Sequence, residues 1–309
     1  MTLVQLAHFV RIAELQSLSK AAAIVRIAQP ALSRQVRNLE RELGADLLVR
    51  HAWGVSLTPA GEVLLARARR LLAEADDARD AVNALSAQPS GRVALGVPTS
   101  VATTLLPPLA AGLREAYPRL QPYFVDGFSA ALHARTLSGE LDLALLYEDR
   151  SIGPLATAPL LDEALMIVAP AGGRSDGEVP LAAGLAGQTL IIGAHPNRLR
   201  RIVDEALGAA AGPERILEVD SLSATIAMVE GGLGLTLLPY SAVARDVARG
   251  AVAVQAVSAP APRRTLLLAR PVDRPPTPAV TAVETTLRTL VETLAPELRW
   301  RPLGRGGPK

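Results

Sequence analysis

The chain has no cysteine among its 309 residues. This absence excludes disulfide bonds, thiolate metal ligands and cysteine nucleophiles together, although it does not by itself identify a cellular compartment. Histidine is also scarce. The four histidines share no metal-ligand spacing, so we expect no metal site and no other cofactor. They are His8, His51, His133 and His195.

The sequence also lacks a long hydrophobic run, although 49% of its residues are apolar. No segment approaches the roughly 18 consecutive apolar residues of a membrane-spanning helix. Met1 leads directly into an amphipathic segment and not into the pattern of a signal peptide. We therefore expect a soluble, cytoplasmic protein without membrane contact. Its length predicts two or three domains, because a domain has roughly 100 to 200 residues.

Catalytic motifs are missing as well. Residues 127–131, Gly-Phe-Ser-Ala-Ala, are the nearest match to a nucleophile elbow, but they lack its closing glycine. Residues 172–174 lack the Gly-Lys-Ser/Thr ending of a phosphate-binding loop. Residues 231–234 lack the glycine order of a dinucleotide-binding loop. We therefore expect no enzymatic activity.

Charge is distributed unevenly along the chain, whose net charge is only +2. Residues 1–58 contain seven basic residues and four acidic ones. The basic residues are Arg11, Lys20, Arg26, Arg34, Arg37, Arg41 and Arg50, and the acidic residues are Glu14, Glu40, Glu42 and Asp46. This excess permits a polyanionic partner such as DNA without requiring one.

The first 44 residues show the pattern of three short helices. Apolar residues recur at helical spacing over residues 2–15, which predicts an amphipathic helix. Ser19 is positioned to cap a second helix. Pro30 suits the first turn of a third helix, and Gly44 suits its end.

The third predicted helix has two different faces. The apolar stripe that should pack inward consists of Leu32, Val36, Leu39 and Leu43. The polar face near its N-terminus consists of Gln29, Pro30, Ser33, Arg34 and Arg37. These side chains can reach base edges and phosphates if the helix enters a major groove. Ala28 cannot cap the helix, which costs about 1 kcal/mol unless Gln29 or a phosphate supplies an acceptor.

Two short apolar-patterned runs follow this helix. They cover residues 47–50 and 55–57, and residues 51–54 separate them, so the pattern predicts a short β-hairpin. A basic hairpin beside such a helix can hold the DNA backbone.

These features together resemble the winged helix-turn-helix of LysR-type transcriptional regulators. The matching motifs are Ser19-Lys20-Ala21-Ala22, Gln29 through Val36, Leu39-Glu40, Leu43-Gly44 and Arg50 through Gly61. Many members have Ser at the position of Ala28 and Phe at the position of Leu48. The resemblance implies that the third helix meets bases or nearby phosphates and that Arg50 and the Gly54 turn approach the backbone. The expected DNA-binding residues are Ser19, Gln29, Pro30, Ala31, Ser33, Arg34, Arg37, Arg50 and Gly54.

The pattern of residues 59–88 predicts one long helix, which follows the DNA-binding domain of residues 1–58. Its apolar residues alternate steps of four and three, which is typical of a coiled-coil seam. The seam consists of Leu64, Ala68, Leu71, Ala75, Ala78, Val82 and Leu85. The alternative is a helix that lies on its own domain. Dimerisation is favoured because a two-fold pair reads two half-sites. The resemblance implies the same, since LysR-type proteins dimerise through this helix and commonly form tetramers.

Residues 89–298 have a different pattern, in which predicted strands and helices alternate. The strands are 93–97, 141–146, 164–169, 189–193, 234–238 and 265–269, and the helices are 101–117, 129–138, 198–211, 222–231 and 275–294. The alternation predicts an α/β fold with largely parallel sheets. The resemblance implies two lobes, like those of a small periplasmic binding protein, with crossings near Leu161 and Arg264. Lobe I would cover about 92–161 and 265–298, lobe II about 162–264, and 299–309 would be a flexible basic tail.

Several polar residues follow predicted strands, at the edge where open α/β sheets bind ligands. Thr99 and Ser100 open a helix and offer hydroxyls beside unpaired N–H groups, which suits an anion. Each such residue could also be a simple helix cap. The resemblance implies that effectors contact this region, and the expected effector-binding residues are Thr99, Ser100, Phe128, His195, Arg198 and Ser221.

The sequence therefore predicts a sequence-specific transcription regulator controlled by a small, anionic effector. Its expected partners are double-stranded promoter DNA, the effector, further copies of itself and RNA polymerase. Two alternatives stay open. An architectural DNA-binding protein without effector would bind DNA irrespective of sequence. A small-molecule binding protein of the transport type would share the two lobes but would leave residues 1–58 unexplained.

Overall fold

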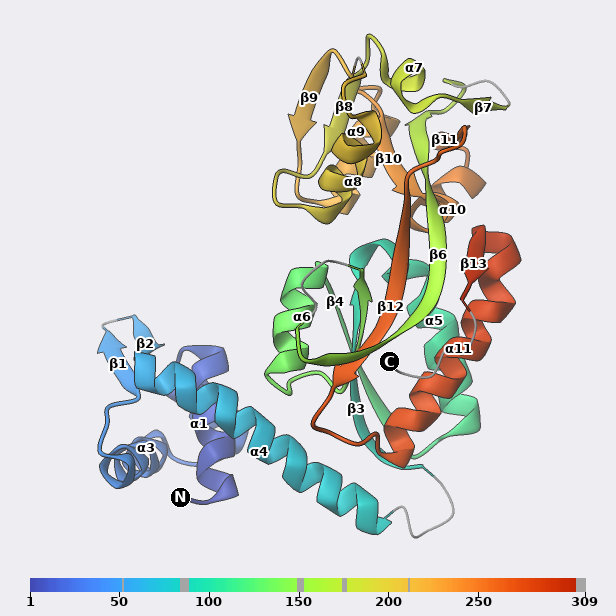
Figure 1. Ribbon diagram of the computed structural model, residues 1–309. Helices are drawn as coiled ribbons and strands as arrows, with labels where there is room; N and C mark the ends of the chain where they lie inside the picture. The colour runs from blue at the N-terminus through green and yellow to red at the C-terminus, as the bar shows by residue number, and fades with distance from the viewer. Residues whose placement is uncertain (52, 84–88, 149–152, 174–176, 211, 304–309) are drawn as a thin grey trace.

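The computed structural model describes residues 1–51, 53–83, 89–148, 153–173, 177–210 and 212–303. Within these ranges the chain forms an N-terminal helical domain, a long connecting helix and two α/β lobes (Figure 1). The two lobes are stacked one above the other, and the N-terminal domain lies beside the lower one. The α/β, two-lobed architecture predicted from the sequence is confirmed.

The N-terminal domain contains α1 (Leu3–Leu15), α2 (Leu18–Val25) and α3 (Gln29–Leu43). The Oγ atom of Ser17 accepts a hydrogen bond from the backbone of Lys20, so Ser17 and not Ser19 caps α2. The prediction was wrong by two residues because both serines precede the same apolar run. Gly44 ends α3 in the left-handed conformation (φ +67°), as predicted.

The core of this domain forms where the three helices meet. Leu32, Val36 and Leu39 of α3 are buried against Phe9 and Ile12 of α1. Leu43 is exposed, contrary to the predicted stripe. The helix ends at this residue, one turn beyond Leu39, the last residue of α3 in the core.

The predicted hairpin is confirmed as β1 (Leu48–His51) and β2 (Gly54–Leu57), which pair antiparallel. The end of the hairpin next to its turn is fixed by the rest of the domain. The backbone N–H of Val55 donates to the carbonyl oxygen of Gln16, in the turn between α1 and α2. A Cβ atom on Gly54 would lie 2.5 Å from the same oxygen, so this close approach requires glycine.

The connecting helix α4 (Pro59–Asn83) packs on α1 of its own chain. Ala68 is buried there in a cluster with Leu6 and Val10, and Leu64 lies against the same cluster. The predicted seam is therefore divided. Its first part contacts the chain's own domain, while Leu71 and Ala78 are exposed. Leu85, the last seam residue, lies outside the described residues.

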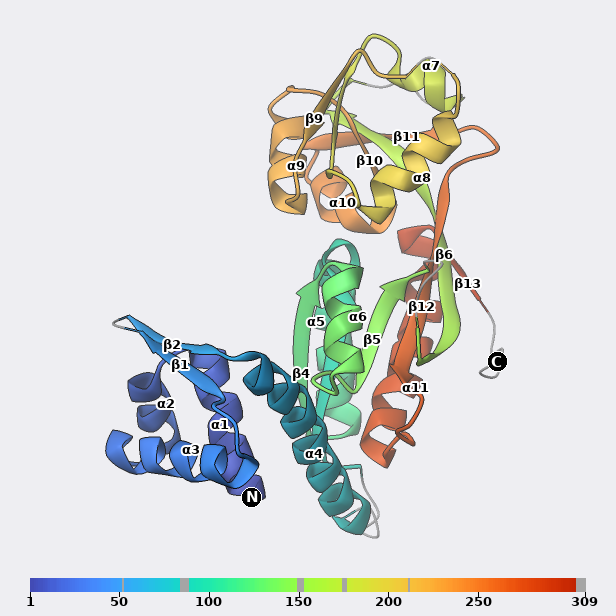
Figure 2. The same ribbon diagram turned by 60° about the vertical axis from the view of Figure 1, so that its left-hand side comes forward.

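Lobe I is built on the strand order β4-β3-β5-β12-β6. Its own strands are β3 (Gly91–Pro98), β4 (Leu120–Gly127) and β5 (Leu143–Tyr147). One face is covered by α5 (Thr99–Ala116) and α11 (Pro278–Leu298), and the other by α6 (Ser129–Leu137). Figure 2 shows α5 and α6 running side by side with these strands.

Two long strands pass between the lobes, β6 (Leu155–Pro170) and β12 (Arg263–Pro271). They pair antiparallel from Leu155↔Pro271 to Ala164↔Arg263. Beyond this segment β6 continues into lobe II, where it pairs with β10 (Thr236–Pro239) and β11 (Val252–Val257). The two predicted crossing residues, Leu161 and Arg264, lie on these strands.

The remaining elements of lobe II are β7 (Glu178–Val179), α7 (Leu181–Leu185), β8 (Thr189–Ile192), α8 (Arg198–Leu207), β9 (Arg215–Glu218), α9 (Leu222–Glu230) and α10 (Tyr240–Ala248). The parallel pairs are β3 with β4 and β5, β7 with β11, and β8 with β9. The pairs that β6 makes with β10, β11, β12 and β13 are antiparallel, and so is the pair of β12 with β5. The expectation of largely parallel sheets therefore fails at the junction.

The end of the chain is more ordered than predicted. The expected flexible tail begins at Arg299, but Trp300–Pro302 form a strand, β13, that pairs with β6 at Leu161, Asp162 and Glu163. Trp300 is buried at the junction. Residues 304–309 lie outside the described residues. Among the described residues, none of the helices combines the length and the hydrophobicity of a membrane-spanning segment.

Candidate functional sites

The first site is the exposed face of α3. Gln29, Pro30, Ala31, Arg34 and Arg37 are all exposed, so the structure leaves this face open to a partner. Ala28 makes no side-chain hydrogen bond to the start of the helix. The first turn therefore presents backbone N–H groups, and Arg34 and Arg37 follow in the next turns, an arrangement that favours a negatively charged partner. Ser19 is exposed on α2.

Ser33 does not belong to the exposed face. Only 5% of its surface is exposed, and its Oγ atom accepts a hydrogen bond from Nη2 of Arg50 at 3.1 Å. The correction has a simple cause: position 33 is three residues before Val36 and one after Leu32, so it lies at the edge of the buried stripe. Ser33 therefore ties the hairpin to α3, while Arg50 remains exposed.

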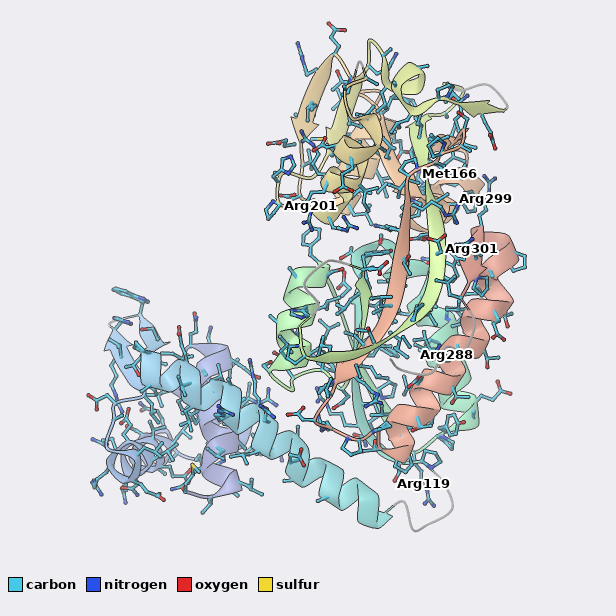
Figure 3. The ribbon with its side chains drawn as sticks, viewed as in Figure 1. Arg119, Met166, Arg201, Arg288, Arg299 and Arg301 are labelled. Carbon is cyan, nitrogen blue, oxygen red and sulfur yellow. The ribbon has the colours of Figure 1, made fainter. Side chains whose placement is uncertain are left out.

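The second site is a cavity of about 530 Å³ between the two lobes. Lobe I contributes the starts of α5 and α6, and lobe II contributes the residues that precede α8 and α9. All six predicted effector residues line it: Thr99, Ser100, Phe128, His195, Arg198 and Ser221. Arg201 also lines the cavity, and Figure 3 labels it on the part of lobe II that lies toward lobe I. Whether these residues bind a ligand stays a prediction.

Four helices begin at this cavity, and the starts of α5 and α6 have no side-chain cap. Each helix start carries unpaired N–H groups and a partial positive charge. The lining also contains three arginines, Arg198, Arg201 and Arg264, against one carboxylate, Asp220. Both the helix ends and the side chains therefore favour an anionic occupant.

Several cavity residues also have a structural contact of their own. The Nε atom of Arg198 donates to the carbonyl oxygen of Glu148 at 3.0 Å, a hydrogen bond that joins the two lobes. Nε2 of His195 lies 3.1 Å from a carboxylate oxygen of Asp204. Ser221 caps α9 through the backbone N–H of Ala224. These contacts fix the side chains at the cavity rim.

Sequence reasoning missed a buried polar network beneath the cavity. At its centre is Glu163 of β6, which is 1% exposed. Its Oε1 atom accepts from Nε of Arg264 and from the Tyr147 hydroxyl, each at 2.8 Å. Its Oε2 atom accepts from Ser241 at 2.8 Å and from the indole N–H of Trp300 at 3.0 Å.

The network reaches the cavity through Arg264, Tyr147 and Ser100. The guanidinium of Arg264 lies 3.7 Å from the Tyr147 ring centroid and donates to the Ser100 hydroxyl at 2.9 Å. Ser100, predicted to bind effector, is thus also part of the junction between the lobes. The signal available in the sequence was Asp162-Glu163, two charges within an otherwise apolar strand. A charged residue is rarely found inside such a strand unless it is paired.

Burial raises the pKa of Tyr147 well above its usual value of 10.0, and the carboxylate of Glu163 raises it further, while Arg264 opposes the shift. The unfolded chain therefore loses this proton first. The stabilisation is complete below about pH 10 and declines as the pH rises above that value. We expect alkaline absorbance titrations of the wild type and of Tyr147→Phe to coincide until the protein unfolds. An extra ionisation in the wild type near pH 10 would contradict this.

The comparison with known families covers the two parts of the chain in which these sites lie. Residues 3–62 match the model for the bacterial regulatory helix-turn-helix protein of the lysR family. Residues 86–292 match the model for the LysR substrate binding domain. The two matches cover both the N-terminal domain and the two lobes.

Individual relatives span the whole chain. The nitrogen assimilation regulatory protein nac of Escherichia coli K12 is 31% identical over 96% of this chain and 97% of its own. The transcriptional dual regulator OxyR of the same organism is 32% identical over 97% and 96%. A solved full-length OxyR variant from Pseudomonas aeruginosa is 28% identical, covers 99% of both chains and has a TM-score of 0.77. The chain therefore belongs to the LysR family and is a DNA-binding transcription regulator with an effector-binding domain.

Proposed function

We propose that this regulator binds promoter DNA as a homodimer or homotetramer and that a small anionic metabolite, bound between the lobes, changes how the paired DNA-binding domains lie on the DNA. The observation that carries the proposal is the meeting of all six predicted effector residues in one cavity, where four helices begin. The proposed action is regulatory and not catalytic, and it takes place in the cytoplasm, where promoter DNA and RNA polymerase meet.

The proposed DNA contact is made by the exposed face of α3 and by the hairpin. Arg34 and Gln29 would reach base edges or nearby phosphates, and Arg37 and Arg50 would hold the backbone. Ser19, Pro30, Ala31 and Gly54 complete the proposed surface. Ser33 acts differently from the prediction, because it orients Arg50 through their hydrogen bond.

The proposed dimer forms through the outer part of α4. Leu64 and Ala68 contact α1 of the same chain, so they are not available to a partner. Leu71 and Ala78 are exposed on the part of the helix beyond them. A two-fold pair would place two recognition helices on two half-sites, and two such pairs would form the tetramer.

The nature of the effector follows from the lining of the cavity. Helix starts and arginines favour a carboxylate or a phosphate, and the cavity volume of about 530 Å³ is within the range for small-molecule sites. The relatives named for hydrogen peroxide do not suggest the same signal here. This chain has no cysteine, so it cannot form a thiol-based peroxide switch.

The effector can act only through a difference in affinity between two arrangements of the oligomer. Tight binding to both arrangements alike would change nothing. The cavity has the geometry that such a difference needs, because its walls belong to two lobes between which the chain crosses on two long strands, β6 and β12.

We expect Thr99→Val to weaken effector binding roughly tenfold or more, because a hydrogen bond to a charged group contributes about 1.5–3 kcal/mol. A panel of small carboxylates and phosphates would first be screened by thermal shift, and the compound that stabilises the protein would then be titrated by calorimetry. Thr103→Val, on the same helix but outside the cavity lining, is the matched control. Equal affinity in both variants would reject Thr99 as a contact.

If no compound binds and DNA binding is indifferent to sequence, the architectural alternative takes the place of this proposal. A salt titration on promoter and random DNA separates the two, because nonspecific binding rests almost wholly on phosphate contacts.

A further inference from the structure

The tip of the β1–β2 hairpin carries an exposed aromatic pair. Trp53 is 87% exposed, which is unusual for the largest apolar side chain, while the chain's other tryptophan, Trp300, is 6% exposed. The indole of Trp53 stacks on the imidazole of His51, with 5.1 Å between ring centroids and 6° between ring planes. Nε2 of His51 lies 2.8 Å from Oγ of Ser56 on the opposite strand.

These contacts hold the indole in a defined orientation. His51 supports one face of the ring, and Ser56 fixes His51 across the hairpin. A large side chain that is ordered before binding loses little conformational entropy when it meets a partner. Exposed tryptophan in such an arrangement is typical of a binding surface.

The hairpin is also fixed relative to α3. Arg50 is joined to Ser33, and Val55, which pairs with Arg50 next to the hairpin turn, is joined to Gln16. Figure 2 shows the hairpin projecting from the N-terminal domain beside α2. A partner seated on the exposed face of α3 is therefore within reach of the hairpin tip.

From this geometry we propose that Trp53 contacts the sugar walls of the DNA groove next to the one that α3 enters. The inference rests on the proposed DNA-binding function and adds a contact of another kind. Deoxyribose presents carbon-bound hydrogens that an indole can cover, and this contact releases no counterion. It therefore contributes affinity that does not depend on salt, unlike contacts made by Arg50 or Arg34.

The test measures affinity across salt concentrations. The probe is a fluorescein-labelled duplex cloned from genomic fragments that the purified wild-type protein retains. Trp53→Ala is expected to weaken binding roughly tenfold, the loss for about 55 Å² of apolar surface at 25 cal/mol per Å². The slope of log K against log salt should stay that of the wild type. Arg50→Ala should reduce the slope by about one unit.

A second measurement uses the native tryptophans. Because only Trp53 is exposed, acrylamide should quench it and leave Trp300 largely unaffected. Adding the duplex to wild-type protein should abolish this accessible fraction. Trp53→Phe should show no accessible fraction with or without DNA, which assigns the signal.

Three outcomes overturn the inference: unchanged affinity in Trp53→Ala, a changed salt slope in that variant, or an indole that acrylamide still reaches in the complex. A Trp53 that becomes protected without DNA, as protein concentration rises, would assign it to self-association instead. Arg34→Ala separates this inference from the proposed function. If Arg34→Ala weakens binding and Trp53→Ala does not, only the aromatic contact fails, whereas if neither does, the proposed DNA surface fails as well.

Discussion

A Glu163→Ala variant is expected to lose about 3–5 kcal/mol of its free energy of unfolding, the range found when one partner of a buried ion pair is removed. The substitution leaves the guanidinium of Arg264 buried without its carboxylate. It also removes the acceptor from the Tyr147 hydroxyl, the Ser241 hydroxyl and the Trp300 indole. Urea unfolding followed by tryptophan fluorescence in a Trp53→Phe background measures this, because Trp300 is then the one remaining tryptophan.

The control is Glu230→Ala, which removes an exposed carboxylate paired with Arg249 and should hardly change the midpoint. A double variant tests the physical reason. Glu163→Leu combined with Arg264→Met removes both charges and should recover much of the lost stability, because an apolar pair carries no desolvation cost. A midpoint for Glu163→Ala equal to that of the wild type would show that the network contributes nothing.

The second large effect is expected in DNA binding. Arg34→Ala should weaken binding to the retained genomic fragments about 5- to 150-fold per subunit, because a guanidinium contact to a base contributes about 1–3 kcal/mol. Dimerisation, measured by sedimentation, should stay unchanged, since α4 lies elsewhere. Fluorescence anisotropy with the labelled duplex measures the affinity.

Arg41→Ala is the matched control for this substitution. Arg41 is also an exposed arginine of α3, but it lies in the last turn, where it donates to Asn38 at 3.3 Å. Its loss should have a far smaller effect. Equal losses in both variants would mean that α3 attracts DNA only by its charge, and no loss in either would reject the recognition-helix assignment.

The N-terminal domain could be predicted from the sequence almost element by element. Its helices are short and local, and each carries its own signals, such as Pro30 at a helix start and Gly44 at a helix end. One error, at the cap of α2, came where two neighbours compete for one role. Ser17 and Ser19 both precede the apolar run of α2, and only the structure shows which hydroxyl faces the free N–H groups.

Residues that line the cavity could be predicted from the sequence, but the volume and shape of the cavity could not. Polar residues at strand ends identify one edge of each sheet, and this rule located Thr99, Ser100 and Ser221. The network below could not be predicted, because it joins residues far apart in sequence. Glu163 and Arg264 are 101 positions apart, and Glu163 and Trp300 are 137 apart. Their meeting depends on the pairing of β6 with β12 and β13.

The division of the α4 seam shows the same limit. A four-and-three spacing predicts an apolar face, but it does not say which neighbour covers that face. Here α1 of the same chain covers Ala68, while Leu71 stays exposed.

Helix α6 begins at the cavity and ends beside α4, and this position has a mechanical consequence. Phe128 and Ser129 at its start line the cavity, whereas Glu140, just beyond its end, lies 3.3 Å from Arg69 of α4. Nine residues make a rod of about 13 Å. Tilting such a rod by about 10° at its cavity end swings the other end by about 2 Å. A shift of that size would separate Glu140 from Arg69 unless α4 moved with it, so α6 is a mechanical link between the cavity and the helix that carries the DNA-binding domain.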